Sequence, residues 1–229
     1  KLNHIESILN EPFIRDQWIQ KYNNKPDNSD IEELFNEFKT IQCKNTIKYI
    51  DILPDTKSTI DLLQENYKIK IGITTGFDKE TTDNIINKLL KNDIYVDSYV
   101  SSTCLDKPGR PEPYMIEENM RKLKIDNPNE IIKVDDTNVG IEEGTNAKCW
   151  TIGVAEWSIN MDVESFEQID ELENNHKLKN EKLKKSRLQL EKSNPHFIIN
   201  SLYELPQIIN NINKHRYDFC DSLIGPVRI

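Results

Sequence analysis

The spacing of apolar and polar residues changes once along the chain, at Pro54. Ahead of it, residues 1–50 carry helical spacing and no strand signal, so this part is predicted to be all helix. Ser29 and Glu32 form a capping-box pattern before an apolar stripe that could serve a core or an interface equally. The stripe consists of Ile31, Leu34, Phe35, Phe38 and Ile41.

After Pro54, β-rich and helical segments alternate, which predicts an α/β fold with a parallel sheet flanked by helices. Ser201 and Glu204 form a capping box before the last helix. The expected strands are residues 68–74, 98–102, 130–134, 150–154 and 196–199. The expected helices are residues 59–67, 78–90, 111–123, 141–147, 163–192 and 201–212.

Charge and composition exclude several function classes. The formal net charge is −9, whereas a nucleic-acid groove needs clustered Lys and Arg, so no nucleic-acid partner is expected. No apolar run reaches the roughly 18 residues of a membrane span, so no membrane association is expected. The four cysteines form neither a C-x-x-C pair nor a disulfide framework, which favours a reducing, cytoplasmic setting.

Two loops that follow or lie between predicted strands carry groups suited to an oxyanion. The first, TTGF at residues 74–77, offers hydroxyls and a flexible backbone, although a Thr-capped turn would look the same. The second, KPGRPEP at residues 107–113, holds Arg110 between prolines. A guanidinium on a stiff loop suits bidentate contact with a phosphoryl or phosphonyl group; a solvated surface Arg is the alternative.

A third loop carries Asp135 and Asp136 at the end of a predicted strand. Carboxylates in this position are hard oxygen ligands suited to Mg²⁺, although Asp is also a common helix N-cap. Ligands of parallel sheets bind at the carboxyl ends of strands, so the three loops are expected to meet at one edge of the sheet.

Taken together, the three loops are more specific than any one of them. A strand-end Thr, a loop cation and a strand-end Asp, in this order, resemble motifs two, three and four of the haloacid-dehalogenase superfamily. Four segments resemble the phosphonoacetaldehyde hydrolases in particular, across residues 1 to about 213. They are GITTGF, KPGRPEPYM, IIKVDDTNVGIEEGTNAKCWTIGV and NPHFIINSLYEL.

The resemblance implies a fold and a division of the chain. The expected fold is a HAD-like Rossmannoid parallel sheet core with a helical C1-type cap, and the first core strand is absent from this chain. Residues 1–52 would be part of the cap, residues 53–214 the core, and residues 215–229 a tail outside the resemblance. Members of the family pair through their caps, so a homodimer is one expected assembly.

The resemblance also implies a reaction, in which the carbon–phosphorus bond of phosphonoacetaldehyde is cleaved to acetaldehyde and phosphate. A cap lysine forms a Schiff base with the aldehyde, and an aspartate takes the phosphoryl group. Lys1-Leu2-Asn3-His4 is similar to the family's Lys-apolar-Asp-His, so Lys1 would form the imine and His4 would assist proton transfer. The other implied site residues are Thr75, Gly76, Phe77 (where the family often has Tyr) and Arg110 for the phosphoryl group, and Asp136 for Mg²⁺.

Two departures from the family pattern stand out. The apolar strand ending in Asp-x-Ala-Gly-Thr, which carries the nucleophile, does not occur in these residues. We therefore expect this chain to be a piece of a longer product and inactive as a hydrolase by itself. Gly140 stands where the family has a second Asp, and Asp135 where it has Gly; Asp135, Glu142 or Glu143 could compensate.

Two other functions remain open from the sequence. One is another capped phosphatase of the superfamily, of the phosphoglycolate type, against which the Lys1 and His4 pair speaks. The other is a degenerate, non-catalytic binding or scaffold protein, which Gly140 and the missing strand favour. The tail segment SLIGPV at residues 222–227 is similar to the opening of a phosphonate aminotransferase, so it would be either the start of a second enzyme or a disordered end.

Overall fold

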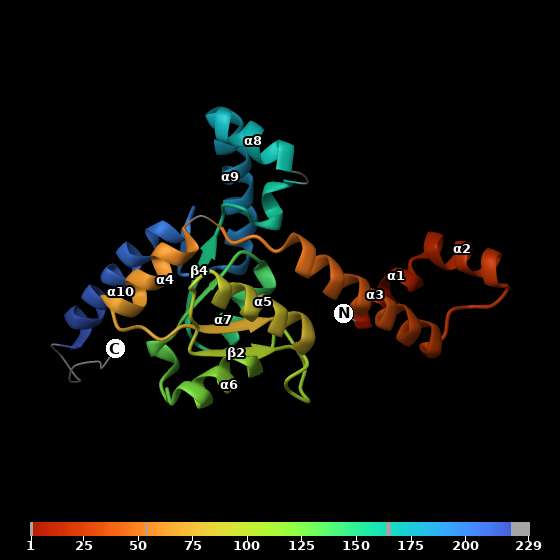
Figure 1. The fold of residues 1–229 in the computed structure, drawn as a ribbon, viewed down its shortest axis with the longest axis horizontal. Coiled ribbons are helices and arrows are strands. Elements are labelled where there is room, and N and C mark those ends of the chain that lie inside the picture. Colours follow the sequence, from red (N-terminus) through yellow and green to blue (C-terminus); the bar gives the residue numbers. More distant parts are fainter. Residues whose placement is uncertain (1, 54, 164–165, 221–229) are drawn as a thin grey trace. The chain divides into compact units, whose positions relative to one another are not determined.

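The computed structural model describes residues 2–53, 55–163 and 166–220 (Figure 1). Tail residues 221–229, and with them the segment SLIGPV, lie outside the described residues. The chain forms two compact units: a helical unit of residues 1–51 and 80–88, and an α/β unit of residues 52–79 and 89–229.

The helical unit confirms the prediction that the first fifty residues form helices. It contains α1 (Leu2–Asn10), α2 (Pro12–Tyr22) and α3 (Asn28–Tyr49). The capping box predicted at Ser29 and Glu32 is wrong, because the box lies two residues earlier. The Asp27 carboxylate accepts hydrogen bonds from Ser29 N and Asp30 N, and the Asp30 carboxylate accepts one from Asp27 N. Asp27 therefore satisfies the first free N–H groups of α3 and leaves Ser29 inside the helix.

The apolar stripe on α3 is only partly covered within the helical unit. The first three residues of the stripe are half-buried, whereas Phe38 and Ile41 are 40% and 57% exposed. Asn84 of α5 (Lys79–Lys91) approaches Cys43 of α3, with 3.5 Å between amide nitrogen and sulfur. Packing within the helical unit therefore covers the N-terminal part of the stripe and leaves its C-terminal end, at Phe38 and Ile41, exposed.

All strands of the α/β unit pair in parallel, as the sequence predicts. β1 (Gly72–Thr75) pairs with β2 (Ser98–Ser101) in one sheet. β3 (Ile132–Asp135), β4 (Trp150–Val154) and β5 (Phe197–Ile199) form the other. In the described part of the chain no strand precedes β1 and none joins β1 to β3, so the sheet is in two pieces.

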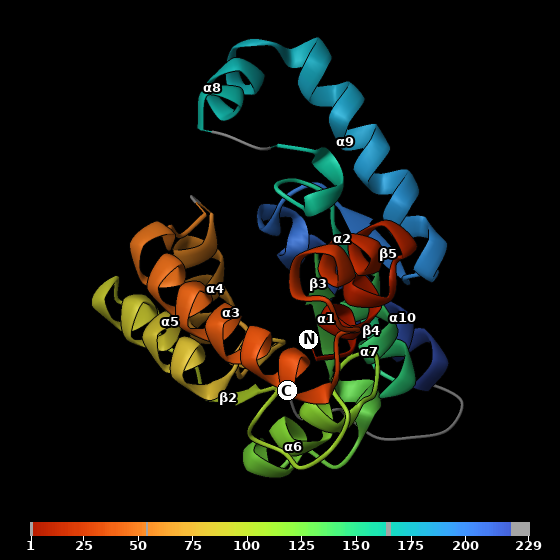
Figure 2. The ribbon, with the colours of Figure 1, turned by 90° about the vertical axis from the view of Figure 1, so that its right-hand side faces the viewer.

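Helices cover the strands of the α/β unit (Figures 1 and 2). α6 packs against β1 and β2, and α7 against β3 and β4. No helix among the described residues is long and apolar enough to cross a membrane. The helices of this unit are α4 (Thr56–Glu65), α6 (Tyr114–Leu123), α7 (Asn138–Asn146), α8 (Phe166–Asn174), α9 (His176–Leu190) and α10 (Leu205–Cys220), while most of α5 belongs to the helical unit. Short 3₁₀ turns are η1 (Pro128–Glu130), η2 (Ile159–Met161), η3 (Glu191–Ser193) and η4 (Leu202–Glu204), the last beginning with the predicted Ser201–Glu204 capping box.

The main apolar cluster fixes the strands that carry the candidate site. Ile152 of β4 and Ile199 of β5 lie at its centre and are almost fully buried. Ile71, ahead of β1, and Val134 of β3 pack against the same cluster. Full burial of a side chain such as that of Ile152 or Ile199 contributes about 1.5–3 kcal/mol, so the strands that carry the candidate site are held firmly in the α/β unit.

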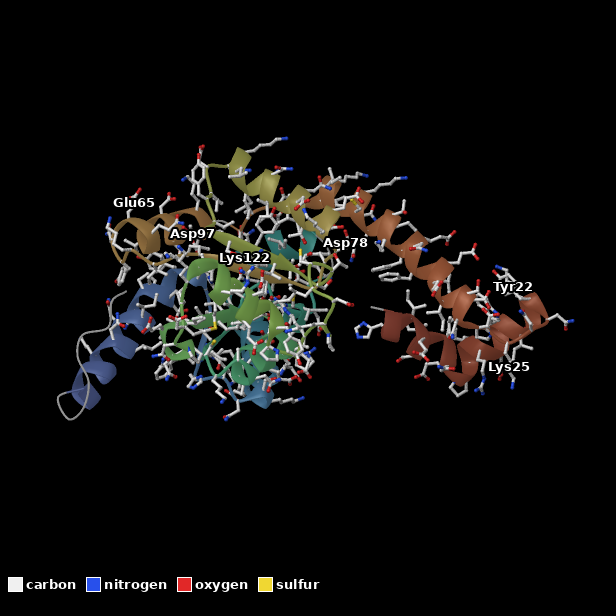
Figure 3. The ribbon with its side chains drawn as sticks, turned by 90° about the horizontal axis from the view of Figure 1, so that it is seen from below. Tyr22, Lys25, Glu65, Asp78, Asp97 and Lys122 are labelled. Carbon is white, nitrogen blue, oxygen red and sulfur yellow. The ribbon has the colours of Figure 1, made fainter. Side chains whose placement is uncertain are left out.

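The strand β1 is shorter than predicted. The pattern predicts a strand over residues 68–74, but Lys68 has a left-handed backbone with φ 56°, and the ladder begins only at Gly72. The Ile71 N–H donates to the carboxylate of Asp97, which is labelled in Figure 3, at 2.7 Å. A side chain therefore satisfies a backbone donor that a strand neighbour would otherwise take.

Candidate active site

The turn after β1 leaves its backbone open to an incoming group. Thr75 Oγ1 accepts a hydrogen bond from Phe77 N at 3.2 Å, and Ser102 Oγ donates to the carbonyls of Gly76 and Phe77. A Cβ placed on Gly76 would have no heavy atom within 4 Å. The turn is thus ordered by its own hydrogen bonds and has free space over Gly76.

The two threonines of this segment have different roles. Thr74 Oγ1 accepts from Arg110 Nη2 at 2.9 Å and Lys133 Nζ at 2.7 Å, and it donates to Glu143 Oε2 at 3.0 Å. A hydroxyl has one donor and two acceptor positions, so Thr74 is saturated by protein partners. The hydroxyl hydrogen of Thr75 has no acceptor among the described residues, which leaves Thr75 as the threonine able to meet a ligand.

Arg110 is held at the carboxyl ends of β1 and β3. Its Nη2 donates to the carbonyl and the hydroxyl of Thr74, at 2.7 and 2.9 Å. Nη1 lies 3.3 Å from Asp135 Oδ2, and Nε lies 2.9 Å from Glu143 Oε2 as an ion pair that is not aligned as a hydrogen bond. A planar guanidinium fixed on three sides can direct its remaining N–H groups at an oxyanion.

Lys133 is a site residue that the sequence analysis missed. Its side chain is 9% exposed, and Nζ lies 3.0 Å from both Asp135 Oδ2 and Glu143 Oε2. Together with Arg110 it forms a buried cluster of two cations and two carboxylates. The signal was a Lys between Ile132 and Val134 in an otherwise apolar strand that ends in two aspartates.

Glu143 supplies the fully buried carboxylate of this cluster. Its side chain is 0% exposed, and Oε2 faces Arg110, Lys133 and Thr74. Oε1 has no hydrogen-bond partner within the described part of the chain. From the sequence, Glu143 is only one of three residues that could compensate for Gly140, whereas the structure places it at the centre of the charge cluster.

The two aspartates at the end of β3 have opposite pKa shifts. Burial would raise the pKa of Asp135, but Lys133, Arg110 and a hydrogen bond from Thr137 outweigh burial and hold the pKa below its ordinary value. Asp136 reaches the surface, but neighbouring groups remove part of its hydration, and this raises its pKa; the Asp135 carboxylate raises it further. A divalent cation at Asp136 would relieve this repulsion.

The fit of the site to Mg²⁺ rests on Asp136. Asp135 already has partners for both carboxylate oxygens, whereas Asp136 is exposed. The described residues contain no group of three or more His, Cys, Asp or Glu placed to hold a metal. Mg²⁺ is commonly held by one or two carboxylates with several waters, which this single carboxylate can serve.

Three further residues, Lys1, His4 and Cys149, carry titratable side chains of types common in catalysis. Lys1 lies outside the described residues, and His4 is an exposed residue of α1 in the helical unit, so their roles stay predictions. Burial raises the pKa of Cys149 to about 12, which keeps its thiol neutral and unsuited to nucleophilic attack.

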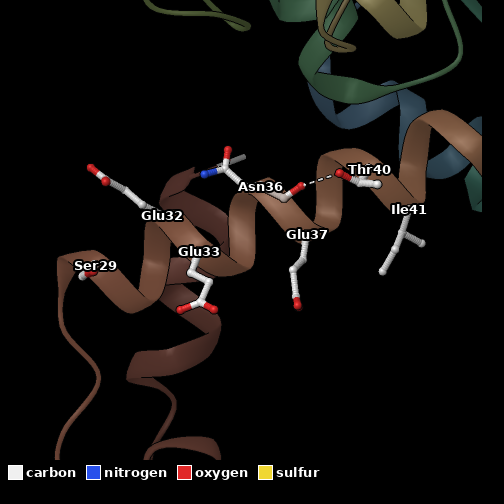
Figure 4. Close-up of a pocket in the computed structure, with 7 residues that line it drawn as sticks. All are labelled: Ser29, Glu32, Glu33, Asn36, Glu37, Thr40 and Ile41. Atoms are coloured by element: carbon white, nitrogen blue, oxygen red, sulfur yellow. Dashed lines mark hydrogen bonds between the residues drawn. The ribbon is translucent and has the colours of Figure 1, made fainter.

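A hollow of about 720 Å³ on α3 does not suit a phosphonate (Figure 4). It is lined by a single helix whose charged groups there are all carboxylates, and these would repel an anion. Its lining residues are Ser29, Glu32, Glu33, Asn36, Glu37, Thr40 and Ile41.

Comparison with known proteins gives the family. Residues 3–154 match the family described as haloacid dehalogenase-like hydrolase. A phosphonoacetaldehyde hydrolase of Bacteroides fragilis is 31% identical over 217 residues, which cover 93% of this chain and 79% of that protein. The chain belongs to the phosphonoacetaldehyde hydrolase family of haloacid dehalogenase-like hydrolases.

Further relatives of this hydrolase agree in name and fold. The phosphonoacetaldehyde hydrolase of Psychromonas ingrahamii is 28% identical over 214 residues, covering 93% of this chain and 70% of that protein. The crystal structure of a phosphonoacetaldehyde hydrolase-like protein from Oleispira antarctica has a TM-score of 0.85 at 26% identity, covering 93% of this chain and 76% of that one. The resemblance, the fold class and the hydrolase class drawn from the sequence are confirmed.

Proposed function

We propose that this site serves hydrolysis of the carbon–phosphorus bond of phosphonoacetaldehyde to acetaldehyde and phosphate. The observation that carries the proposal is the position of Arg110. Its guanidinium is held by Thr74, Asp135 and Glu143 at the strand ends that also present Gly76 and Asp136. The names of the relatives support the choice of substrate.

The charges of the site support a requirement for Mg²⁺. Arg110 and Lys133 are balanced by Asp135 and Glu143, and Asp136 adds a further negative charge. A phosphonate anion therefore meets a site without net positive charge. Bound at Asp136, Mg²⁺ would supply the missing charge and polarise a phosphoryl oxygen.

The open backbone at Gly76, the Thr75 hydroxyl and Arg110 would then hold the phosphoryl oxygens. Phe77 would border them with an apolar ring in place of the hydroxyl that a Tyr would bring. Lys1 would form an imine with the aldehyde. This imine would accept the electrons of the breaking carbon–phosphorus bond, and His4 would transfer a proton at the imine nitrogen.

Borohydride trapping tests the lysine chemistry on this chain without any need for turnover. With phosphonoacetaldehyde and sodium borohydride, peptide mass mapping is expected to find a reduced adduct concentrated on the Lys1 side chain. Lys1→Arg should abolish it, while the control Lys25→Arg, at an exposed lysine labelled in Figure 3, should leave it unchanged. Equal labelling of surface lysines, or labelling that survives Lys1→Arg, would contradict the proposal and favour a phosphatase of the phosphoglycolate type.

Phosphate release is expected to be absent from residues 1–229 alone, because they contain no Asp-x-Ala-Gly-Thr run to take the phosphoryl group. The measurement is phosphate released from phosphonoacetaldehyde with and without Mg²⁺, with the phosphonoacetaldehyde hydrolase of Bacteroides fragilis as positive control. Robust Mg²⁺-dependent turnover by this chain would show that another residue acts as nucleophile.

A further inference from the structure

The side chain of Asp135 is fully committed to protein partners. Oδ1 accepts from Thr137 N at 3.0 Å and from Thr137 Oγ1 at 2.6 Å. Oδ2 lies 3.0 Å from Lys133 Nζ and 3.3 Å from Arg110 Nη1. The side chain is only 7% exposed. Asp135 therefore orients neighbours and has little capacity left for a ligand.

Gly140, in the first turn of α7, faces this carboxylate directly. A Cβ on Gly140 would lie 2.0 Å from Asp135 Cγ and 2.2 Å from each carboxylate oxygen. The structure has no glycine with positive φ among its described residues, so Gly140 is not needed for its backbone conformation. It is needed for space, because the Asp135 carboxylate fills the volume that a side chain at position 140 would occupy.

We propose that positions 135 and 140 share a single carboxylate site. The Asp135 carboxylate fills this site from the end of β3, and the missing side chain at Gly140 leaves room for it. From this site Asp135 acts as a positioning residue for Arg110. The sharing of the site does not depend on the proposed function. Only the statement that Arg110 then faces a phosphoryl group rests on it.

Geometry and charge both limit the site to one carboxylate. The carboxyl carbon of an Asp at position 140 would lie one bond, about 1.5 Å, beyond its Cβ, which is within reach of the same two cations once Asp135 is removed. With Asp135 present, the added group would overlap it and add a third anion to a cluster that already balances Arg110 and Lys133 with Asp135 and Glu143. Either position can supply the carboxylate, but not both.

An exchange experiment tests this directly in the full chain. Asp135→Gly and Gly140→Asp are each expected to lower the melting temperature by about 6 °C or more, the first through unbalanced buried cations and the second through overlap. The double variant is expected to recover most of the loss. Gly109→Asp, where a Cβ would meet nothing within 4 Å, is the control of equal charge and should not rescue Asp135→Gly.

A second comparison, between Asp135→Gly and Asp135→Asn, separates the effect of side-chain volume from the effect of charge. Asp135→Asn keeps the volume of the side chain, so Gly140→Asp should rescue Asp135→Gly but not Asp135→Asn. Positioning is read from the Arg110 Nη–H signals in ¹H–¹⁵N spectra, because Nη1 faces Asp135. These signals should be slow to exchange in the wild type, lost in Asp135→Gly and restored in the double variant.

The outcomes are decisive in both directions. Additive losses in the double variant, or rescue by Gly109→Asp, would overturn the shared site, and recovered stability without the Arg110 signal would overturn the positioning role. Both readouts are independent of lysine trapping, so a failure of the proposed function would appear in the borohydride experiment alone.

Discussion

Replacing Lys133 with Met is expected to lower the free energy of unfolding by about 3–5 kcal/mol. The lysine is 9% exposed and lies 3.0 Å from both Asp135 and Glu143, so its loss leaves two buried carboxylates with only Arg110 to balance them. Urea-induced unfolding followed by circular dichroism measures the change. An effect as small as that of a surface lysine would show that the cluster does not act as a buried ion set.

A matched control and a compensating variant sharpen this result. Lys57→Met removes the exposed lysine paired with Asp61 at 2.8 Å on α4 and should leave the unfolding midpoint nearly unchanged. Glu143→Leu combined with Lys133→Met removes one charge of each sign, leaving Arg110 balanced by Asp135. The double variant is therefore expected to be more stable than either single variant, because buried ion pairs are replaced by apolar groups at little cost. Purely additive losses would contradict this account.

Replacing Gly144 with Ala is expected to destabilise the protein by about 1–3 kcal/mol. The new Cβ would lie 2.7 Å from Lys133 Cβ and Thr151 Cγ2, and 2.8 Å from Lys133 Cγ. Lys133 Cβ is fixed by the backbone of β3. The two γ carbons can move only if Lys133 leaves its ion pairs or Thr151 leaves its hydrogen bond to His196, so α7 must move off the sheet. The gain in helix propensity of about 1 kcal/mol offsets only part of this cost.

Gly109→Ala is the control for this substitution, since a Cβ there would meet nothing within 4 Å. Thermal unfolding of the two variants should therefore differ by several degrees, with Gly109→Ala close to the wild type. Equal melting temperatures would mean that α7 is not in close contact with β3 and β4.

The sequence by itself determined the class of fold and the order of the chemical groups. The segment of residues 150–154 is short, apolar and bounded by turn residues, and this local pattern suffices to predict β4. Ser201 and Glu204 are three residues apart, so their capping box is a local property that the sequence contains in full. The order Thr, Arg, Asp along an α/β chain likewise led to the family.

Local reasoning failed where two nearby residues competed for one role. Asp27 and Ser29 are both good N-caps, and the start of α3 went to Asp27. Thr74 and Thr75 alternate in direction along β1, and the pattern of four strand residues does not say which one faces the charge cluster. The structure gives that place to Thr74 and leaves the Thr75 hydroxyl for a ligand.

Only the tertiary structure decided how the charges are grouped. Four separate parts of the chain supply Thr74, Arg110, Lys133 and Glu143. The fold brings them into contact, with Lys133 and Glu143 buried and Thr74 and Arg110 partly buried. Gly140 looked like the loss of a functional carboxylate as long as position alone was considered. The fold shows why it is a glycine: the Asp135 carboxylate occupies the same space, and no one-dimensional pattern records that two residues five apart compete for one volume.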